Sequence, residues 1–287
     1  MKKFTIIILA LLLGTSSLFA QEEKTEDRPV RQPFESSVLI DMQTVQIPYK
    51  GTLMFNIEHR FGTIDNGITD LYGVYAPSNI RLALNYSLMN NLVVGYGTTK
   101  DQKLQDFQVK WTALQQTRQN TIPVGVALYG NMAIDARETD VFGKHYEFTN
   151  RFSYFAQLII SRKIGYAVAL QVAPSFSHIN SVQPGYEHDK VAIAFSGKIN
   201  VSPQSSIIFQ YETPLEIEGM YENIDPVFKP KDNFGIGWEI STSTHAFQMF
   251  VSTARSLVPQ YNVMYNDNDW TDGQIMLGFN ITRLWSF

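Results

Sequence analysis

The C-terminal segment of the chain strongly restricts the fold. Residues 274–287 read QIMLGFNITRLWSF, and apolar side chains fill alternate positions: Ile275, Leu277, Phe279, Ile281, Trp285 and Phe287. A period of two puts these side chains on one face of a β-strand. An alternating strand that ends on an aromatic residue, in a chain that begins with an export signal, is typical of an outer-membrane β-barrel.

The export signal occupies residues 1–20. Lys2 and Lys3 form its positive part, an apolar core of about eleven residues follows, and a small-residue cleavage pattern ends at Ala20. This core is shorter than the roughly 20 apolar residues that a spanning helix needs. No other segment is apolar enough to be such a helix, so a mature protein that begins at Gln21 would cross a membrane with strands.

Composition excludes several classes of function. The 287 residues contain no Cys, which removes disulfides, thiol catalysis and Cys-based metal sites. The net charge of -4 argues against a nucleic-acid partner. The sequence contains no Gly-rich phosphate loop and no haem attachment motif, so we expect no cofactor.

Twelve segments with strand-like patterns follow residue 50, and they predict an antiparallel up-and-down barrel over residues 51–287. An even number of strands is the rule for bacterial barrels. The segments are 51–61, 79–87, 91–99, 104–116, 122–134, 151–162, 165–176, 189–200, 204–213, 233–242, 245–254 and 273–287.

The connections between these segments alternate in length. If both chain ends lie in the periplasm, the periplasmic connections are short: 88–90, 117–121, 163–164, 201–203 and 241–244. The external ones are long, apart from 100–103: 62–78, 135–150, 177–188, 214–232 and 255–272. Short periplasmic turns and long external loops are expected of a membrane barrel. The alternative is a secreted soluble β-protein, either a sandwich or a periplasmic lipid-binding barrel, in which the apolar faces meet in a core.

Charged residues in the strands stand at the alternate positions that do not belong to the apolar face. A charge that faces lipid at the midplane costs roughly 2–4 kcal/mol, so these side chains should point into the lumen. If the first hairpin pairs with an odd register sum, Glu58 lies opposite Arg81. Such residues can form ion pairs that fill a narrow barrel, or line a wet pore. The predicted lumen-lining residues are Asn56, Glu58, Arg60, Arg81, Lys110, Lys198, Glu212 and Glu239.

Residues 21–50 precede the barrel as a periplasmic linker or plug. Residues 21–35 are charged and contain Pro, as expected of a linker. The following segment, Ser36–Gln46, has three possible roles: a short extra strand, a plug, or the lead-in to the barrel.

The predicted external loops are acidic, with Asp65, Asp70, Asp135, Glu138, Asp140, Glu147, Glu187, Glu216, Glu218, Glu222, Asp225, Asp267, Asp269 and Asp272. This surface suits divalent cations that bridge anionic lipopolysaccharide, so we expect membrane lipid and lipopolysaccharide as partners. Oxygen ligands suit Ca²⁺, but Asp267, Asp269 and Asp272 lack the twelve-residue loop pattern and form a weak metal candidate. The terminal Phe287 predicts recognition by the barrel-assembly machinery.

Catalysis has little support in the sequence, and we predict no enzymatic activity. None of the five His residues stands in a metal-binding helix pattern. His178 and His188 share one predicted external loop. His59 and His245 have outward parity near strand ends, where a membrane interface accounts for them. A membrane phospholipase would need Ser and His matched on the outer face of the barrel.

The first predicted hairpin resembles a known family. Residues 51–62 read GTLMFNIEHRFG, followed by Leu71–Tyr75 and by NIRLALNY at residues 79–86. In this segment, and by pattern over most of the mature chain, the sequence is similar to an uncharacterised outer-membrane β-barrel family of Bacteroidota-type bacteria. The resemblance implies a signal peptide, a barrel and an aromatic C-terminus, and it implies no activity.

These features together lead to two hypotheses about function, with a third for the plug. The first is a passive channel or small-solute carrier with a mixed-charge lumen. The second is a closed barrel that acts as a structural or surface-binding protein through its acidic loops. The third is transport of lipid or hydrophobic molecules with Ser36–Gln46 as an internal plug, whose deletion should raise permeability. The transported substrate and the oligomeric state do not follow from the sequence.

Overall fold

The structure is a computed structural model that describes residues 27–217 and 228–287. The predicted signal peptide and the acidic residues Glu218, Glu222 and Asp225 lie outside the described residues. Among the residues that are described, no helix has the length and apolar character needed to cross a membrane.

Strands β3 to β14 form one closed antiparallel barrel. Each strand pairs with its neighbour in the sequence, and β14 closes the ring against β3. The bounds are β3 Thr52–Thr63, β4 Asn79–Met89, β5 Leu92–Thr99, β6 Leu104–Leu114, β7 Gly125–Asp135, β8 Phe152–Ile164, β9 Val168–Ile179, β10 Asp189–Asn200, β11 Ser205–Leu215, β12 Asn233–Ser241, β13 His245–Ser252 and β14 Met276–Ser286. The predicted fold class and all twelve predicted strands are confirmed, with ends shifted by a few residues.

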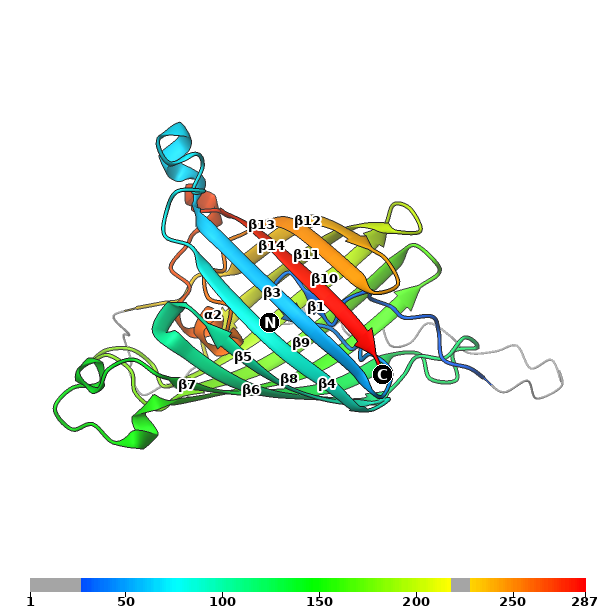
Figure 1. The fold of residues 1–287 in the computed structure, drawn as a ribbon, viewed down its shortest axis with the longest axis horizontal. Coiled ribbons are helices and arrows are strands. Elements are labelled where there is room, and N and C mark those ends of the chain that lie inside the picture. Colours follow the sequence, from blue (N-terminus) through cyan, green and yellow to red (C-terminus); the bar gives the residue numbers. More distant parts are fainter. Residues whose placement is uncertain (1–26, 218–227) are drawn as a thin grey trace.

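The long connections gather at the end of the barrel opposite the C-terminus (Figure 1). They carry short 3₁₀ turns: η1 Ile64–Asp70, η3 Thr139–Phe142, η4 Phe148–Arg151 and η5 Trp270–Asp272, with η2 Asp101–Lys103 in the short external connection. Predicted turn 117–121 is in fact longer, because β6 ends at Leu114 and β7 begins only at Gly125. The other periplasmic turns are short, as predicted.

Burial alternates along the strands, as a two-sided wall requires. On β7 and β8, Leu128, Tyr154 and Leu158 are exposed, whereas Ala127 and Ile159 are completely buried. The exposed face is apolar over most of the barrel wall, and closure of the ring pairs the backbone groups between strands. Both properties suit a hydrocarbon solvent.

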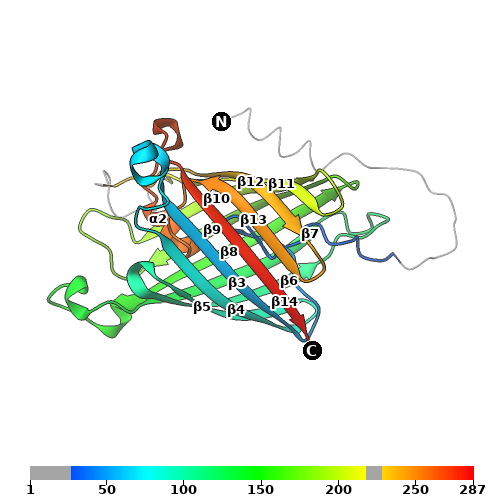
Figure 2. The same cartoon turned by 45° about the horizontal axis from the view of Figure 1, so that its top comes forward.

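The segment before the barrel lies inside it. Residues 34–47, here named the plug, form a small hairpin of β1 (Val38–Leu39) and β2 (Met42–Gln43), and most of its side chains are buried. Figure 2 shows this dark blue segment running into the barrel between the strands. Of the three roles considered for Ser36–Gln46, this position corresponds to a plug.

The chain just before the plug is fastened to the periplasmic rim. Asp27 accepts hydrogen bonds from the backbone N–H groups of Gln119 and Thr121, and the N–H of Val30 donates to Gln116 O at 2.8 Å. Both contacts are made with connection 115–124, which explains why this turn is longer than the pattern predicted.

The last external connection closes the other end. The first part of connection 253–275 folds back into the mouth, where helix α2 (Pro259–Tyr265) has five buried residues. The side chain of Gln260 donates to Asn131 Oδ1 and Ser153 Oγ, both at 3.1 Å. Val263 joins the apolar cluster that also contains the plug residues Leu39 and Ile40. The external loop and the plug therefore meet inside the barrel.

Candidate functional site in the barrel lumen

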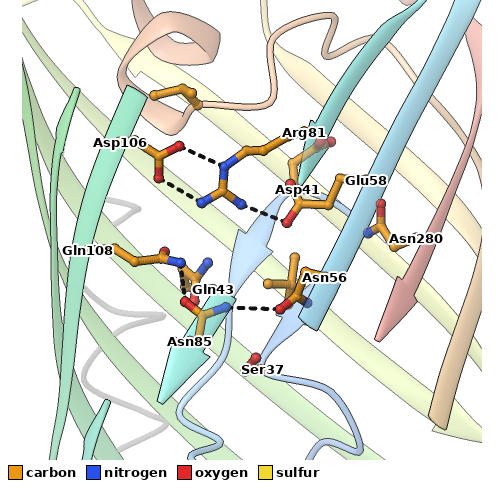
Figure 3. A network of polar contacts seen from close by, with 12 residues as sticks. Ser37, Asp41, Gln43, Asn56, Glu58, Arg81, Asn85, Asp106, Gln108 and Asn280 are labelled. Carbon is orange, nitrogen blue, oxygen red and sulfur yellow. Dashed lines mark hydrogen bonds and ion pairs between the residues drawn. The ribbon is translucent and has the colours of Figure 1, made fainter. Parts of the chain in front are cut away.

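Arg81 is the centre of a buried charge network on β3, β4 and β6. Its guanidinium donates to Glu58 at 2.9 Å and to both oxygens of Asp106, at 2.9 and 2.7 Å. Figure 3 shows Arg81 lying between these two carboxylates. The Glu58–Arg81 pair follows from the register that the sequence predicted, because the two residues are direct cross-strand partners. One cation thus balances two anions, with Asn131 donating a further hydrogen bond to Asp106.

A second network holds the tip of the plug. Asp41 forms an ion pair with Arg60 of β3, and both side chains are almost completely buried. Asp41 also accepts hydrogen bonds from Gln210 at 2.8 Å and from Ser252 at 3.1 Å. Wall residues from β3, β11 and β13 therefore converge on one carboxylate of the plug.

The plug backbone is bound by amide side chains of the wall. The side-chain N–H of Asn280 donates to Ile40 O at 2.7 Å. Gln248 donates to Val38 O at 2.8 Å and accepts from the N–H of Ile40 at 3.1 Å. Ile40 adopts a left-handed backbone conformation with φ of 57°, which turns the chain at this point. These amides take the place of the β-ladder partners that so short a hairpin lacks.

The two predicted lumen lysines contact the plug. Lys110 donates to Ser37 O at 3.1 Å and to Gln43 Oε1 at 3.2 Å. Lys198 pairs with Glu35 at 3.3 Å. Both lysines of the wall therefore contact the N-terminal segment.

The remaining predicted residues bind amides and hydroxyls. Glu212 accepts from Asn233 at 2.9 Å, and Glu239 accepts from Gln248 at 2.7 Å. Neither carboxylate forms an ion pair with a described residue. Asn56 donates to Thr282 Oγ1 at 3.0 Å.

All eight predicted lumen residues thus lie in the interior and are buried. Sequence reasoning missed Asp41 and Asp106, which complete the two charge networks. Asp106 shares the parity of Lys110 in the same strand, which could have identified it as inward. Asp41 is the single charge in residues 36–47, and a lone charge in a segment that enters a barrel is a signal for a partner.

The opposite side of the lumen carries an apolar cluster between its polar side chains. Strands β7 to β11 contribute inward Ala, Ile and aromatic side chains that pack on Phe34, Leu39, Met42 and Val45 of the plug. The wall residues are Ala127, Tyr129, Phe155, Ile159, Ala169, Ala173, Ala192, Ala194 and Ile208. This part of the wall is mixed, because Gln171, Lys198, Gln210 and Glu212 are buried on the same strands.

With the plug in place, little empty space remains. The cavity beside Lys110 and Arg81 has a volume of about 10 Å³, and the cavity between Asp41 and Asn262 has about 20 Å³. A single water needs roughly 10–15 Å³ by the same measure. At these two places, in the described part of the chain, the plug therefore leaves room for about one water each.

The weak metal candidate and the histidines are placed differently. Asp269 accepts a hydrogen bond from the backbone N–H of Thr271 and forms an ion pair with Lys231 at 3.0 Å. The positive charge beside this carboxylate is therefore that of a lysine side chain. In residues 27–217 and 228–287, no three His, Cys, Asp or Glu side chains are grouped to hold a metal ion. His178 and His188 do come together, with ring centroids 6.3 Å apart, and His178 Nδ1 lies 2.7 Å from Asp189.

A family model that covers most of the chain supports the barrel architecture. The family described as "Membrane bound beta barrel domain (DUF5777)" matches residues 34–285. No curated protein matches the sequence. Among solved structures, the NanC porin covers 82% of this chain and 99% of its own, with 7% identity and a TM-score of 0.49. The KdgM porin has the same coverage, 6% identity and a TM-score of 0.46. Outer membrane phospholipase A from Escherichia coli has 12% identity, 82% and 90% coverage, and a TM-score of 0.41.

Proposed function

For a chain that belongs to this family of membrane-bound β-barrels, we propose a gated channel or carrier for small solutes, with the plug as its gate. The barrel lies in the outer membrane. The proposal keeps the mixed-charge lumen predicted from the sequence and adds that the lumen is closed until the plug moves. We propose no catalytic role for any residue.

The observation that carries this proposal is the Asp41–Arg60 pair at the plug tip. A buried ion pair adds little net stability compared with apolar side chains of similar volume. Its better-attested use is to fix a register or to support a switch. A plug that served only as filling could be held by apolar packing alone, whereas this plug has a charged latch against three wall strands.

Closure at both ends favours a second candidate. The external loop with α2 and the plug each fill part of the lumen, and the cavity between them has room for about one water. A permanently closed barrel would serve as a structural protein or as a platform for its acidic loops. The two candidates differ in whether the plug ever leaves.

The experiment is a planar-bilayer conductance measurement with a plug that can be locked. A side-chain Cβ at Gly235 would lie 3.2 Å from Ile40 side-chain atoms, so an Ile40→Cys/Gly235→Cys pair is close enough for a disulfide. The chain has no other Cys. The lock would be built into a full-length Asp41→Asn variant, in which the latch is weakened.

We expect current from Asp41→Asn, no current from the oxidised locked variant, and recovery of the current on reduction. Leu84→Cys/Tyr96→Cys, placed between two exposed positions of the outer wall, is the matched control and should leave the current unchanged by oxidation. A folded Asp41→Asn barrel that stays electrically silent would support the structural role instead.

A further inference from the structure

The wall between β8 and β9 has an interruption in its ladder. Their paired residues run from Ser153↔Ile179 to Gln157↔Ser175 and resume at Ile160↔Val172. The gap lies opposite Pro174, in the middle of β9. On the other side of β9, pairing with β10 continues through Pro174.

Proline accounts for this interruption. It has no N–H to donate to a ladder, and for that reason it is confined in sheets to edges and bulges. A closed barrel has no edge, and an unpaired backbone group in hydrocarbon costs several kcal/mol. Pro174 is exposed on the lipid face, so the barrel carries a weak point halfway across the membrane.

An apolar groove of about 650 Å³ lies on the outer surface at this place. It is lined by Leu158, Pro174 and Phe176, and its floor is low because Gly130 and Ala156 carry small side chains or none. The groove is an open, shallow depression of the outer surface and not an enclosed pocket.

The groove and the interior lie on the two faces of a single layer of paired strands. Tyr129 and Gln157 line the outer groove and also line the inner cavity beside the plug. On the inner face of this part of the wall, the apolar Phe155, Ile159 and Ala173 alternate with polar side chains. The Ser175 hydroxyl, on the inward side of β9, is buried and has no hydrogen-bond partner among the described residues.

From this juxtaposition we propose that the β8–β9 wall is a lateral passage. A small amphipathic molecule, with an apolar body and one hydrogen-bonding group, would move through it between the lumen and the membrane. The apolar body fits the groove and the apolar side chains of the lumen wall, and Ser175 offers a partner to the polar group. This inference rests on the proposed function, because the molecule can occupy the lumen only when the plug moves.

The test uses full-length protein in lipid vesicles and a medium-chain alcohol that carries a photoreactive diazirine. Labelled residues are mapped by mass spectrometry in the Asp41→Asn background. We expect label on the inward residues Phe155 and Ser175 as well as on the outward residues Leu158 and Phe176.

Two changes close the passage. Pro174→Val restores an N–H donor, and Ala156→Cys/Phe176→Cys joins two direct cross-strand partners beside the gap. Both should reduce inward labelling to background, while the matched lock Leu84→Cys/Tyr96→Cys on β4 and β5 should leave it unchanged. Heat-modifiable migration on a detergent gel checks that each variant is folded.

The outcomes separate this inference from the channel. Inward labelling that persists in folded Pro174→Val and in the oxidised β8–β9 lock means that the molecule enters from the aqueous ends, and it overturns the lateral passage. Label confined to Leu158 and Phe176 in every protein overturns it as well. If Asp41→Asn carries ionic current, the channel proposal is supported whichever labelling result is obtained. If inward labelling is abolished by the β8–β9 lock but no current is seen, only the lateral passage is supported.

Discussion

At the scale of single residues, the charged side chains in the lumen are not paired one to one. Arg81 alone serves Glu58 and Asp106, whereas Lys110 has only oxygen atoms of neutral groups as described partners. Removing one member of a buried pair is more harmful than removing the pair, because an unpaired charge stays in a poorly solvated place. Substitutions of different charged wall residues should therefore change the free energy of unfolding by different amounts.

Arg81→Gln should destabilise the folded barrel by about 3–5 kcal/mol, because it leaves two carboxylates without their cation. Urea unfolding in lipid vesicles measures this loss. The double variant Glu58→Gln/Arg81→Gln, which leaves only Asp106 charged, should lose less stability than Arg81→Gln alone. A double variant that is less stable than the single one would contradict this account.

Asp269 allows a prediction about pH outside the membrane-spanning strands. Hydrogen bonds from Thr271, followed by the contact with Lys231, lower the pKa of this carboxyl from 3.8 to about 2. A carboxyl with a lowered pKa stabilises the folded loop above its unfolded pKa, and this contribution is lost as pH falls through about 2. NMR titration of the Asp269 side chain should show a midpoint near 2 in the wild type. A midpoint near 3.8 would mean that the loop contact does not form in solution.

At the scale of elements, the local sequence pattern did not decide where the plug lies. The twelve strands could be predicted because period-two alternation and loop length are local signals, and the inward charges followed from the cost of charge in lipid. The plug contacts join residues that are far apart in sequence: Asp41 with Gln210, and Ile40 with Asn280. Alternation carries no information about such pairs, so three roles for Ser36–Gln46 stayed open until the structure showed its place.

The same reasoning applies to α2 in the external loop. Its seven residues are too few to show a helical period, and their burial depends on Asn131 and Ser153 in strands more than 100 positions away in the chain. The acidic residues around it made the loop look solvent-exposed. Sequence reasoning therefore expected a surface loop where the structure places a helix inside the mouth.

As an element, the plug should move without unfolding the barrel. Asp41→Asn leaves the Arg60 charge unpaired and should weaken docking by about 3 kcal/mol, which is roughly 100-fold in the opening equilibrium. Hydrogen exchange at the amides of residues 38–43 should become faster by that factor, while β3 to β14 stay protected. The matched control Asp65→Asn removes the same charge from an exposed turn and should change neither. Faster exchange throughout the barrel would show that the plug is part of the folding core.

At the scale of the whole molecule, two closures act in series between the periplasm and the outside. The plug enters from the periplasmic end, and the loop with α2 enters from the other end. Both contribute to one apolar cluster, in which Val263 of α2 joins Leu39 and Ile40 of the plug. On the proposed function, a solute would cross the lumen only when both closures are displaced.

This arrangement predicts how gating variants combine. Asp41→Asn weakens the plug, and Gln260→Ala removes the hydrogen bonds of α2 to Asn131 and Ser153. The two side chains share no hydrogen-bond partner, so their free-energy effects on the conducting state should add. In planar bilayers, the open probability of the double variant should then rise by the product of the two single factors. If the plug were the only closure, Gln260→Ala would have no effect, and the double variant would conduct no more than Asp41→Asn.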